Sequence, residues 1–258
     1  MADKFLAVAK KAALEAGVVI SKYSSKNLTK NIKGGDLSNF ATQADIEAEK
    51  VIVKILGTHF PEHNIVGEEG TKIYKNSEYT WFIDPLDGTF TFGQKIPFFT
   101  VSIGLIKNDL PILGVINHVA FKNLYWAVFK KGAYLNDKRI HVSSKKSLTE
   151  SAAVLEPGHK QNRSAKMDLY VNKLITKIAY HYTFGSAAVT LALVADASLD
   201  LYVTEAYPWD VAAGTILIRE AGGKVTDFAG QEPDWSKERL SVVASNGLIH
   251  DQILESLI

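Results

Sequence analysis

The sequence predicts an α+β protein in which all 258 residues form a single unit. Three observations lead to this prediction. Apolar residues recur at helical spacing near the start of the chain, turn-separated segments rich in β-formers fill its middle, and strands alternate with helices in its second half. No repeat, low-complexity segment or long linker separates the halves 1–142 and 143–258, so we expect them to pack together.

The first half begins with an amphipathic helix. Apolar residues spaced three or four apart predict this helix over residues 3–23. The polar stretch 30–45 contains a glycine pair and is typical of a loop that ends at a helix N-terminus. A second apolar pattern predicts a helix over residues 46–56, which we expect Gly57 and Pro61 to end.

Strands are predicted after the second helix. Residues 64–67 form a short apolar candidate, and the aromatic, β-branched run 79–83 has the composition of a buried strand. We expect Pro85 to stop that strand because it has no backbone N–H to donate. An antiparallel meander should follow, with strands at 98–106, 112–119 and 124–129 and a hairpin at 132–140.

The second half alternates strands with helices. The strand candidates are residues 152–155, 199–203, 224–226 and 240–244. The helix candidates are residues 163–178, a helix opened by 185–188, a helix that starts at 209–210, and residues 248–257.

Composition limits the kind of protein this chain can be. A hydrophobic content of 47% and a charged content of 22% are ordinary for a globular protein with a sizeable core. The net charge of +1 gives no indication of binding to nucleic acid or to an acidic membrane. The absence of cysteine excludes disulfides, thiolate metal sites and a cysteine nucleophile. No secretion signal or membrane-spanning run is present in the sequence, so we expect a cytoplasmic protein.

The stretch from Asp84 to Thr89 contains the first candidate functional residues. Asp84 and Asp87 lie three residues apart at the end of a predicted strand, and Gly88 and Thr89 follow. Two carboxylates beside free backbone N–H groups suit hard divalent cations together with a phosphate. A plain polar turn is the alternative interpretation. An aspartyl-phosphate phosphatase is set aside, because its nucleophilic and acidic Asp residues lie two positions apart.

Further acids extend the pattern. Glu68 follows a strand in Val-Gly-Glu-Glu, and Asp210 opens a helix in Pro-Trp-Asp-Val-Ala-Ala-Gly. With Asp-Pro-Leu-Asp-Gly-Thr and the later Glu-Ala-Gly-Gly, these segments closely resemble the inositol monophosphatase family of metal-dependent, lithium-sensitive phosphatases. The match runs in order from Ala41–Asp45 to Val242–Asn246 and covers most of the chain.

The resemblance implies a layered αβαβα sandwich of the inositol monophosphatase and fructose-1,6-bisphosphatase type, and two to three Mg²⁺ ions per subunit. Glu68, Asp84 and the carbonyl of Leu86 would hold one ion. Asp84, Asp87 and Asp210 would hold a second, and a weaker third would use Glu68. Two such ions can clamp the attacking and leaving oxygens of an in-line phosphoryl displacement.

The resemblance also implies direct attack by a metal-bound water, with no phosphoenzyme. Thr89 would orient this water and help to remove its proton, together with Glu68 or with Asp45. Lys33 resembles a loop lysine that closes over the site. The residues expected to contact substrate are Asp87, Gly88, Thr89, Ser186, Ala187, Glu205 and Asp210.

Two departures from the family pattern concern the substrate and not the metal chemistry. Thr91 stands where the family commonly has Asn. Glu205 lies five residues before Asp210, whereas the family's substrate-binding Glu lies about seven before. Inositol 1-phosphate is the leading substrate. The alternative substrates are fructose 1,6-bisphosphate, alone or together with inositol 1-phosphate in a dual enzyme, and then 3′-phosphoadenosine 5′-phosphate. The alternative to an enzyme is a non-enzymatic scaffold that binds metal and phosphate. We expect a homodimer that acts on a small phosphorylated polyol or sugar.

Overall fold

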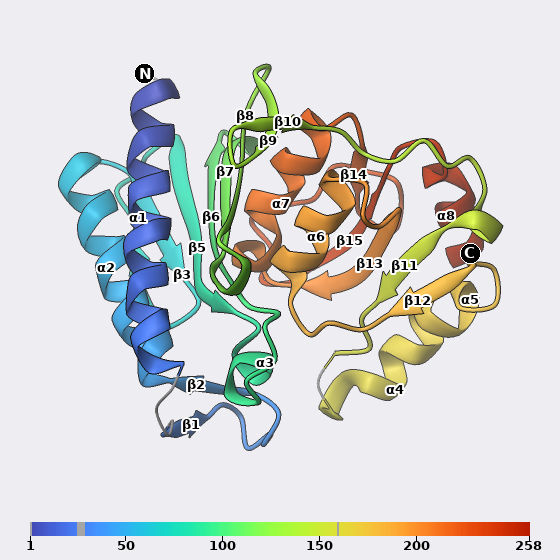
Figure 1. The fold of residues 1–258 in the computed structure, drawn as a ribbon, viewed down its shortest axis with the longest axis horizontal. Coiled ribbons are helices and arrows are strands. Elements are labelled where there is room, and N and C mark those ends of the chain that lie inside the picture. The colour runs from blue at the N-terminus through green and yellow to red at the C-terminus, as the bar shows by residue number, and fades with distance from the viewer. Residues whose placement is uncertain (1, 25–28, 159) are drawn as a thin grey trace.

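The computed structural model describes residues 2–24, 29–158 and 160–258. Helices and sheets alternate in layers in the order α, β, α, β, α (Figure 1). α1 and α2 cover the outer face of the first sheet, and α6 and α7 lie between the two sheets. α4, α5 and α8 cover the far face of the second sheet. This arrangement confirms the predicted α+β class and its layered αβαβα form.

The predicted helices occur in the predicted order, but the helix predicted over residues 163–178 ends at Leu174 and is π-helical in its middle, and the short helix Thr89–Gly93 was not predicted. The α-helices are α1 (Ala2–Tyr23), α2 (Gln43–His59), α3 (Thr89–Gly93), α4 (Arg163–Lys166), α5 (Asn172–Leu174), α6 (Ala187–Ala195), α7 (Pro208–Glu220) and α8 (His250–Leu257). A π-helical segment joins α4 to α5, and short 3₁₀ turns occur at Val119–Phe121, Leu148–Glu150 and Lys160–Asn162. Among the described helices, none is long and apolar enough to cross a membrane.

The first sheet has eight strands in the order β10-β9-β8-β7-β6-β5-β3-β4. Its antiparallel run from β6 to β10 is the predicted meander. β5 pairs with β6 in antiparallel orientation, and β3 pairs with β5 in parallel. Its strands are β3 (Asn64–Gly67), β4 (Lys72–Ile73), β5 (Tyr79–Asp87), β6 (Thr100–Lys107), β7 (Leu110–His118), β8 (Asn123–Val128), β9 (Gly132–Leu135) and β10 (Lys138–Ile140).

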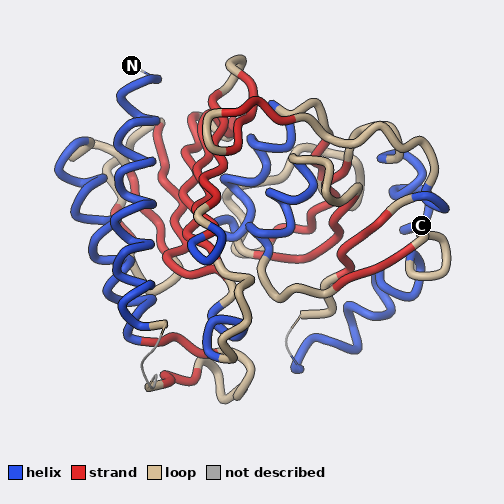
Figure 2. Tube along the Cα trace, viewed as in Figure 1, coloured by secondary structure: helices blue, strands red, loops and turns tan. Residues whose placement is uncertain are grey.

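The second sheet has five strands in the order β12-β11-β13-β15-β14, and a separate two-stranded hairpin joins β1 to β2. Figure 2 shows the strands of the two larger sheets on either side of α6 and α7. The strands are β1 (Lys30–Ile32), β2 (Phe40–Thr42), β11 (Ala152–Leu155), β12 (Tyr180–Tyr182), β13 (Leu201–Ala206), β14 (Lys224–Thr226) and β15 (Leu240–Ser245).

Two expected element ends and one expected loop were wrong. Gly57 does not end the second helix, because α2 continues to His59. Pro85 does not end the central strand, since β5 runs to Asp87 with a register shift between Asp84 and Asp87. The missing N–H of Pro85 falls inside this irregularity, where no regular ladder bond is required. The predicted loop 30–45 contains the hairpin of β1 and β2, whose cross-strand pairing a local pattern does not reveal.

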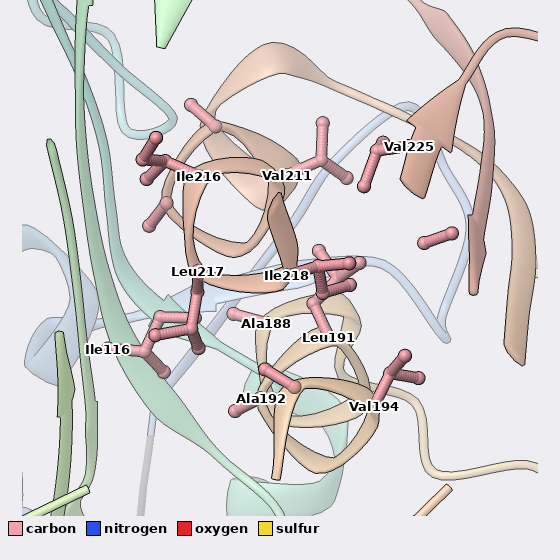
Figure 3. Packing of buried hydrophobic residues seen from close by; sticks show 14 of the residues in the cluster. Ile116, Ala188, Leu191, Ala192, Val194, Val211, Ile216, Leu217, Ile218 and Val225 are labelled. Atoms are coloured by element: carbon pink, nitrogen blue, oxygen red, sulfur yellow. The ribbon is translucent and has the colours of Figure 1, made fainter. Parts of the chain in front are cut away.

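The largest hydrophobic core lies between the sheets. It includes Leu191 of α6, Ile216 and Leu217 of α7 and Ile116 of β7, and Leu217 lies beside Ile116 (Figure 3). α7 approaches the first sheet closely at Gly104, where a Cβ would lie only 2.6 Å from the Cβ of Ala212. The glycine therefore lets the helix lie directly on β6.

Candidate active site

Three carboxylates from distant parts of the chain meet at one end of the first sheet. Glu68 follows β3, Asp84 lies in β5, and Asp210 lies in the first turn of α7. One carboxylate oxygen from each residue lies within 4.8 Å of the other two. Because β3 and β5 are parallel neighbours, their carboxyl ends reach the same edge of the sheet. This pairing brings Glu68 beside Asp84.

The irregularity in β5 orients Asp84. Asp84 pairs with Ser102 of β6, and the regular register resumes only where Asp87 pairs with Thr100. The backbone N–H of Leu86 donates to Asp84 Oδ1 at 2.9 Å. Such an irregularity re-aims side chains that a regular strand would point to alternate faces. The irregularity therefore allows the side chains of Asp84 and Asp87 to face the same site.

A contact between the sheet and α7 brings in Asp210. The hydroxyl of Ser102 donates to the carbonyl of Trp209 at 3.2 Å. Since Ser102 is the cross-strand partner of Asp84, this bond ties the first turn of α7 to the strand position of Asp84. Asp210 itself is oriented by its own helix, because its Oδ2 accepts the backbone N–H of Tyr207 at 2.8 Å.

Asp87 lies against the N-terminus of α6. Its Oδ2 accepts the Ser186 hydroxyl at 2.6 Å and the Ala188 N–H at 2.5 Å, and its Oδ1 accepts the Ala187 N–H at 3.3 Å. Ser186 and Ala187, expected from the family resemblance to contact substrate, therefore contact Asp87 in this structure. A carboxylate at a helix N-terminus is stabilised by the free N–H groups there.

Thr89 forms a hydrogen bond with the buried carboxylate of Asp45. The Thr89 hydroxyl donates to Asp45 Oδ1 at 2.8 Å and also lies 3.0 Å from the Leu86 carbonyl oxygen. Asp45 Oδ2 accepts the Thr42 N–H at 2.8 Å and the Thr42 hydroxyl at 2.5 Å, in the capping box of α2. Burial raises the pKa of Asp45 to about 6, so this carboxyl can take up a proton near neutral pH.

The turn between Asp87 and Thr89 requires glycine. Gly88 has φ +93°, and a Cβ there would lie 2.5 Å from the Phe98 carbonyl oxygen. Thr91, which departs from the family pattern, closes this turn through its hydroxyl, which lies 2.7 Å from the Gly88 carbonyl oxygen and 2.5 Å from that of Phe98. Thr91 therefore supports the turn that carries Thr89.

Lys33 reaches the site from the loop between β1 and β2. Its Nζ donates to Glu68 Oε1 at 2.9 Å and to Glu69 Oε1 at 2.8 Å. Although burial opposes its charge, the carboxylates of Glu68 and Glu69 raise the pKa of Lys33 above its usual value. Burial and the charge of Glu68 raise the pKa of Glu69 to about 7.

The electrostatics of the site favour a bound cation. Burial, and then the charge of Glu68, raise the pKa values of Asp84 and Asp210 well above the usual range of a carboxyl. Burial raises the pKa of Asp87 to about 6. The converging donors Glu68, Asp84 and Asp210 are carboxylates, with no sulfur or imidazole among them. Oxygen donors of this kind fit a hard divalent cation such as Mg²⁺, whose charge would offset the repulsion.

Glu205 lies half-buried near the end of β13. Its backbone carbonyl accepts the Nζ of Lys166 at 2.8 Å, and Lys166 is itself only 5% exposed. Burial and the charge of Arg239 lower the pKa of Lys166, and the charges of Glu205, Glu156 and Asp210 oppose this shift. This buried ammonium was not anticipated from the sequence, because nothing in its local pattern distinguishes it from an exposed helical lysine.

Sequence reasoning also missed Glu49 of α2. Its carboxylate is 4% exposed and accepts the Glu69 N–H at 2.8 Å, the Thr71 N–H at 3.0 Å and the Thr71 hydroxyl at 2.6 Å. The available signal was its spacing. Asp45 and Glu49 lie four residues apart and therefore share one face of α2.

Comparison with known proteins gives a consistent result. The model of the Inositol monophosphatase family matches residues 1–257. A fructose-1,6-bisphosphatase/inositol-1-monophosphatase of Aquifex aeolicus is 36% identical over 254 residues, 98% of this chain and 94% of that protein. An inositol monophosphatase of Mesembryanthemum crystallinum is 36% identical over 261 residues, 98% of this chain and 95% of that protein.

A solved structure shows the same fold. The extragenic suppressor protein suhB of Bartonella henselae superposes with a TM-score of 0.91 at 31% sequence identity. The superposition covers 98% of each chain, so it includes both sheets and all layers described above.

Proposed function

The chain belongs to the inositol monophosphatase family and is a phosphoric monoester hydrolase, and we propose that it is an Mg²⁺-dependent inositol-1-monophosphatase. One observation carries the proposal. The cluster of Glu68, Asp84 and Asp210 lies at the end of β5, from which the chain continues directly to the Thr89–Asp45 pair. Ligands for a divalent cation and a hydroxyl–carboxylate pair for proton transfer are the groups that hydrolysis of a phosphate monoester needs.

The proposed metal ligands are Glu68, Asp84 and the Leu86 carbonyl for one Mg²⁺, and Asp84, Asp87 and Asp210 for a second. A weaker third ion would use Glu68. The convergence of three of these carboxylates within 4.8 Å supports the assignment. When bound, such ions lower the pKa of a coordinated water and neutralise the phosphoryl oxygens.

Thr89 and Asp45 would remove the proton of the attacking water. The Thr89 hydroxyl donates to Asp45, so its lone pairs are left to accept a hydrogen bond from a water on its other side. As that water loses its proton, Thr89 can pass its own proton to Asp45, whose pKa of about 6 suits this task. Glu68 is the alternative proton acceptor.

Phosphate and substrate contacts are proposed on the surrounding residues. The N–H groups of Gly88 and Thr89 would bind phosphate oxygens at the turn. Lys33 would contribute positive charge over the site, which is supported by its bonds to Glu68 and Glu69. Ser186 and Ala187 would border the substrate, as would Glu205. The carboxylate of Glu205 would then accept hydrogen bonds from polyol hydroxyl groups.

Fructose 1,6-bisphosphate is the second candidate substrate. The relative from Aquifex aeolicus carries both activities in its name, and this chain is 36% identical to it. The expected selectivity residue, Glu205, lies only five residues before Asp210. 3′-Phosphoadenosine 5′-phosphate is a third candidate, which rests on the family resemblance alone. Inhibition by millimolar Li⁺ and a cytoplasmic location remain predictions from the sequence.

We also propose a homodimer. A row of aromatic rings that reaches the surface supports it. Tyr180, Tyr182, Phe184 and Phe98 follow one another at centroid distances of 4.8, 5.4 and 4.7 Å, with the first pair tilted and the next two pairs stacked. Tyr180 and Tyr182 are exposed, and Phe184 and Phe98 are half-buried. Tyr180 is 61% exposed and lies on the edge strand β12. Light scattering on the intact protein and on Tyr180→Asp would test this. A monomeric wild-type protein would contradict the proposal.

A turnover panel tests the function itself. Phosphate release from inositol 1-phosphate, fructose 1,6-bisphosphate and 3′-phosphoadenosine 5′-phosphate should be measured with Mg²⁺ and with chelator. We expect Mg²⁺-dependent release, fastest from inositol 1-phosphate. Asp200→Asn is a suitable control variant, because Asp200 is as buried as Asp84 but lies at the far end of β13 from Asp210. If another compound of the panel is hydrolysed faster, that compound replaces inositol 1-phosphate as the proposed substrate. If no compound releases phosphate, the proposed function is refuted.

A further inference from the structure

We infer that Glu49 is a positioning residue for the metal site, which it serves by holding the loop that carries Glu68. This inference rests on the proposed metal-dependent function. Glu49 lies on the inner face of α2, and both of its carboxylate oxygens are used. Oε2 accepts the Glu69 N–H at 2.8 Å, and Oε1 accepts the Thr71 N–H at 3.0 Å and the Thr71 hydroxyl at 2.6 Å.

The bond to Glu69 acts directly on Glu68. The N–H of Glu69 belongs to the peptide unit that follows Glu68, so Glu49 fixes the orientation of that peptide plane. On the other side, the Glu68 N–H donates to the Ile83 carbonyl at 3.2 Å. The backbone of Glu68 is thus held from both sides, and its carboxylate lies within 4.8 Å of those of Asp84 and Asp210.

Gly67 makes this contact possible. A Cβ at position 67 would lie 2.5 Å from Glu49 Oε2 and 2.8 Å from its carboxyl carbon. Only glycine therefore allows the carboxylate to reach the loop backbone without displacement. The φ of Gly67 is not in the left-handed region, so close approach is what requires glycine here.

The charge of Glu49 is notable because it adds to an acidic region. In the described part of the chain, no Lys, Arg or His lies within ion-pair distance of this buried carboxylate. The carboxylate instead accepts three hydrogen bonds from the loop that contains Glu69 and Thr71. A carboxylate accepts from several converging donors at once, which an amide of the same shape cannot do because one of its two groups is a donor.

Helix α2 therefore serves two parts of the site. Asp45 orients Thr89, and Glu49, one turn later on the same face, orients Glu68. Residues that hold metal ligands in place are known to change metal affinity by about 10-fold to 100-fold when altered. We expect Glu49 to act in this way, without itself contacting metal or substrate.

The test compares Glu49→Gln with Asp200→Asn in the full chain. Asp200 is the matched control, because it too is a buried carboxylate with several donors: Ser143 Oγ at 2.5 Å, Lys145 Nζ at 2.9 Å and the Ala152 N–H at 2.6 Å. Three quantities are measured: the Mg²⁺ concentration for half-maximal rate, Mn²⁺ affinity by electron paramagnetic resonance without substrate, and Tm in chelator.

We expect Glu49→Gln to weaken Mn²⁺ binding and to raise the half-maximal Mg²⁺ concentration by about 10-fold, with a smaller change in kcat at saturating Mg²⁺. Asp200→Asn should lower Tm and leave both metal readouts within about twofold. Gly67→Ala should reproduce the metal phenotype of Glu49→Gln, and combining the two changes should add little, since both break one contact.

Two outcomes overturn the inference. The first is a Glu49→Gln variant that loses stability as Asp200→Asn does but keeps its Mn²⁺ affinity. The second is full additivity of Glu49→Gln and Gly67→Ala in the metal readouts. If the unmodified protein binds no Mn²⁺ and shows no Mg²⁺-dependent turnover, the proposed function fails instead.

Glu49→Asp keeps the charge on a shorter side chain. Its Mn²⁺ affinity and its half-maximal Mg²⁺ concentration should lie between those of the wild type and of Glu49→Gln.

Discussion

The Thr89 hydroxyl lies 2.8 Å from Asp45 Oδ1, although 44 residues separate the two in the sequence. Asp45 is fully buried, and its second oxygen is occupied by the N–H and hydroxyl of Thr42. The capping box of α2 therefore fixes the carboxylate that accepts the hydrogen bond from Thr89. The predictions below start from this pair and extend to the rest of the site.

Removing the Thr89 hydroxyl should slow the chemical step. We expect Thr89→Ala to lower kcat by about 100-fold or more with little change in KM, because general acid–base assistance contributes roughly this much. Thr89→Ser, which keeps the hydroxyl, is the control and should retain most of the rate. Steady-state kinetics on inositol 1-phosphate provide the measurement. An alanine variant as active as the serine variant would show that the hydroxyl has no part in the reaction.

Neutralising Asp84 should abolish turnover and stabilise the metal-free protein. Asp84 is 1% exposed, and burial and the charge of Glu68 raise its pKa. Asp84→Asn removes a proposed ligand of both ions, so we expect less than about a tenth of the wild-type kcat at saturating Mg²⁺. The same change removes a like charge, so Tm in chelator should rise. Retained activity, or a lower Tm in chelator, would argue against this account.

Glu205 should govern which alcohol is accepted. The metal and phosphate contacts are shared by every substrate, whereas a carboxylate that accepts bonds from hydroxyl groups can discriminate among them. We expect Glu205→Gln to reduce kcat/KM for inositol 1-phosphate by roughly 1–3 kcal/mol of transition-state binding. Hydrolysis of an aryl phosphate, measured on the same preparation, should barely change. An equal loss on both substrates would assign Glu205 to the metal site or to the fold.

His250 should make the protein less stable as pH falls. The ring is fully buried between the hydroxyls of Thr226 and Ser245, each 2.9 Å from a ring nitrogen, and burial lowers its pKa from 6.5 to about 4. Between pH 6.5 and 4 the unfolded chain binds a proton at His250 that the folded chain excludes, so stability declines through this window. Above pH 6.5 both states are neutral and the effect vanishes.

Urea unfolding at several pH values would measure this effect. His250→Gln should be less stable than the wild type at pH 7.5, and the difference should narrow as the pH is lowered through the window above, because glutamine does not titrate. His59→Gln, at an exposed position, is the control and should follow the wild type. A constant difference between His250→Gln and the wild type across this range would contradict the prediction.

Much of the fold and most of the candidate ligands could be predicted from the sequence, since their signals are local. The N-terminal helix followed from apolar spacing, and its predicted range of residues 3–23 differs from α1 by one residue. The meander from β6 to β10 followed from short β-rich runs separated by turns. Asp84 and Asp87 stand in one short motif. Their residue types and spacing, together with the family resemblance, were enough to indicate hard-metal and phosphate chemistry.

Only the tertiary structure decided how these residues meet. The edge strands β4 and β12 and the hairpin of β1 and β2 depend on pairing partners, and a local pattern does not reveal them. The bond from Ser102 to Trp209 spans 107 residues, and it sets the first turn of α7 against the strand position of Asp84. Likewise, Glu49 had no motif of its own, because its partners come from another element. Residue types and short spacings are encoded locally, whereas the distance between two carboxylates is set by the packing of helices and sheets far apart in the chain.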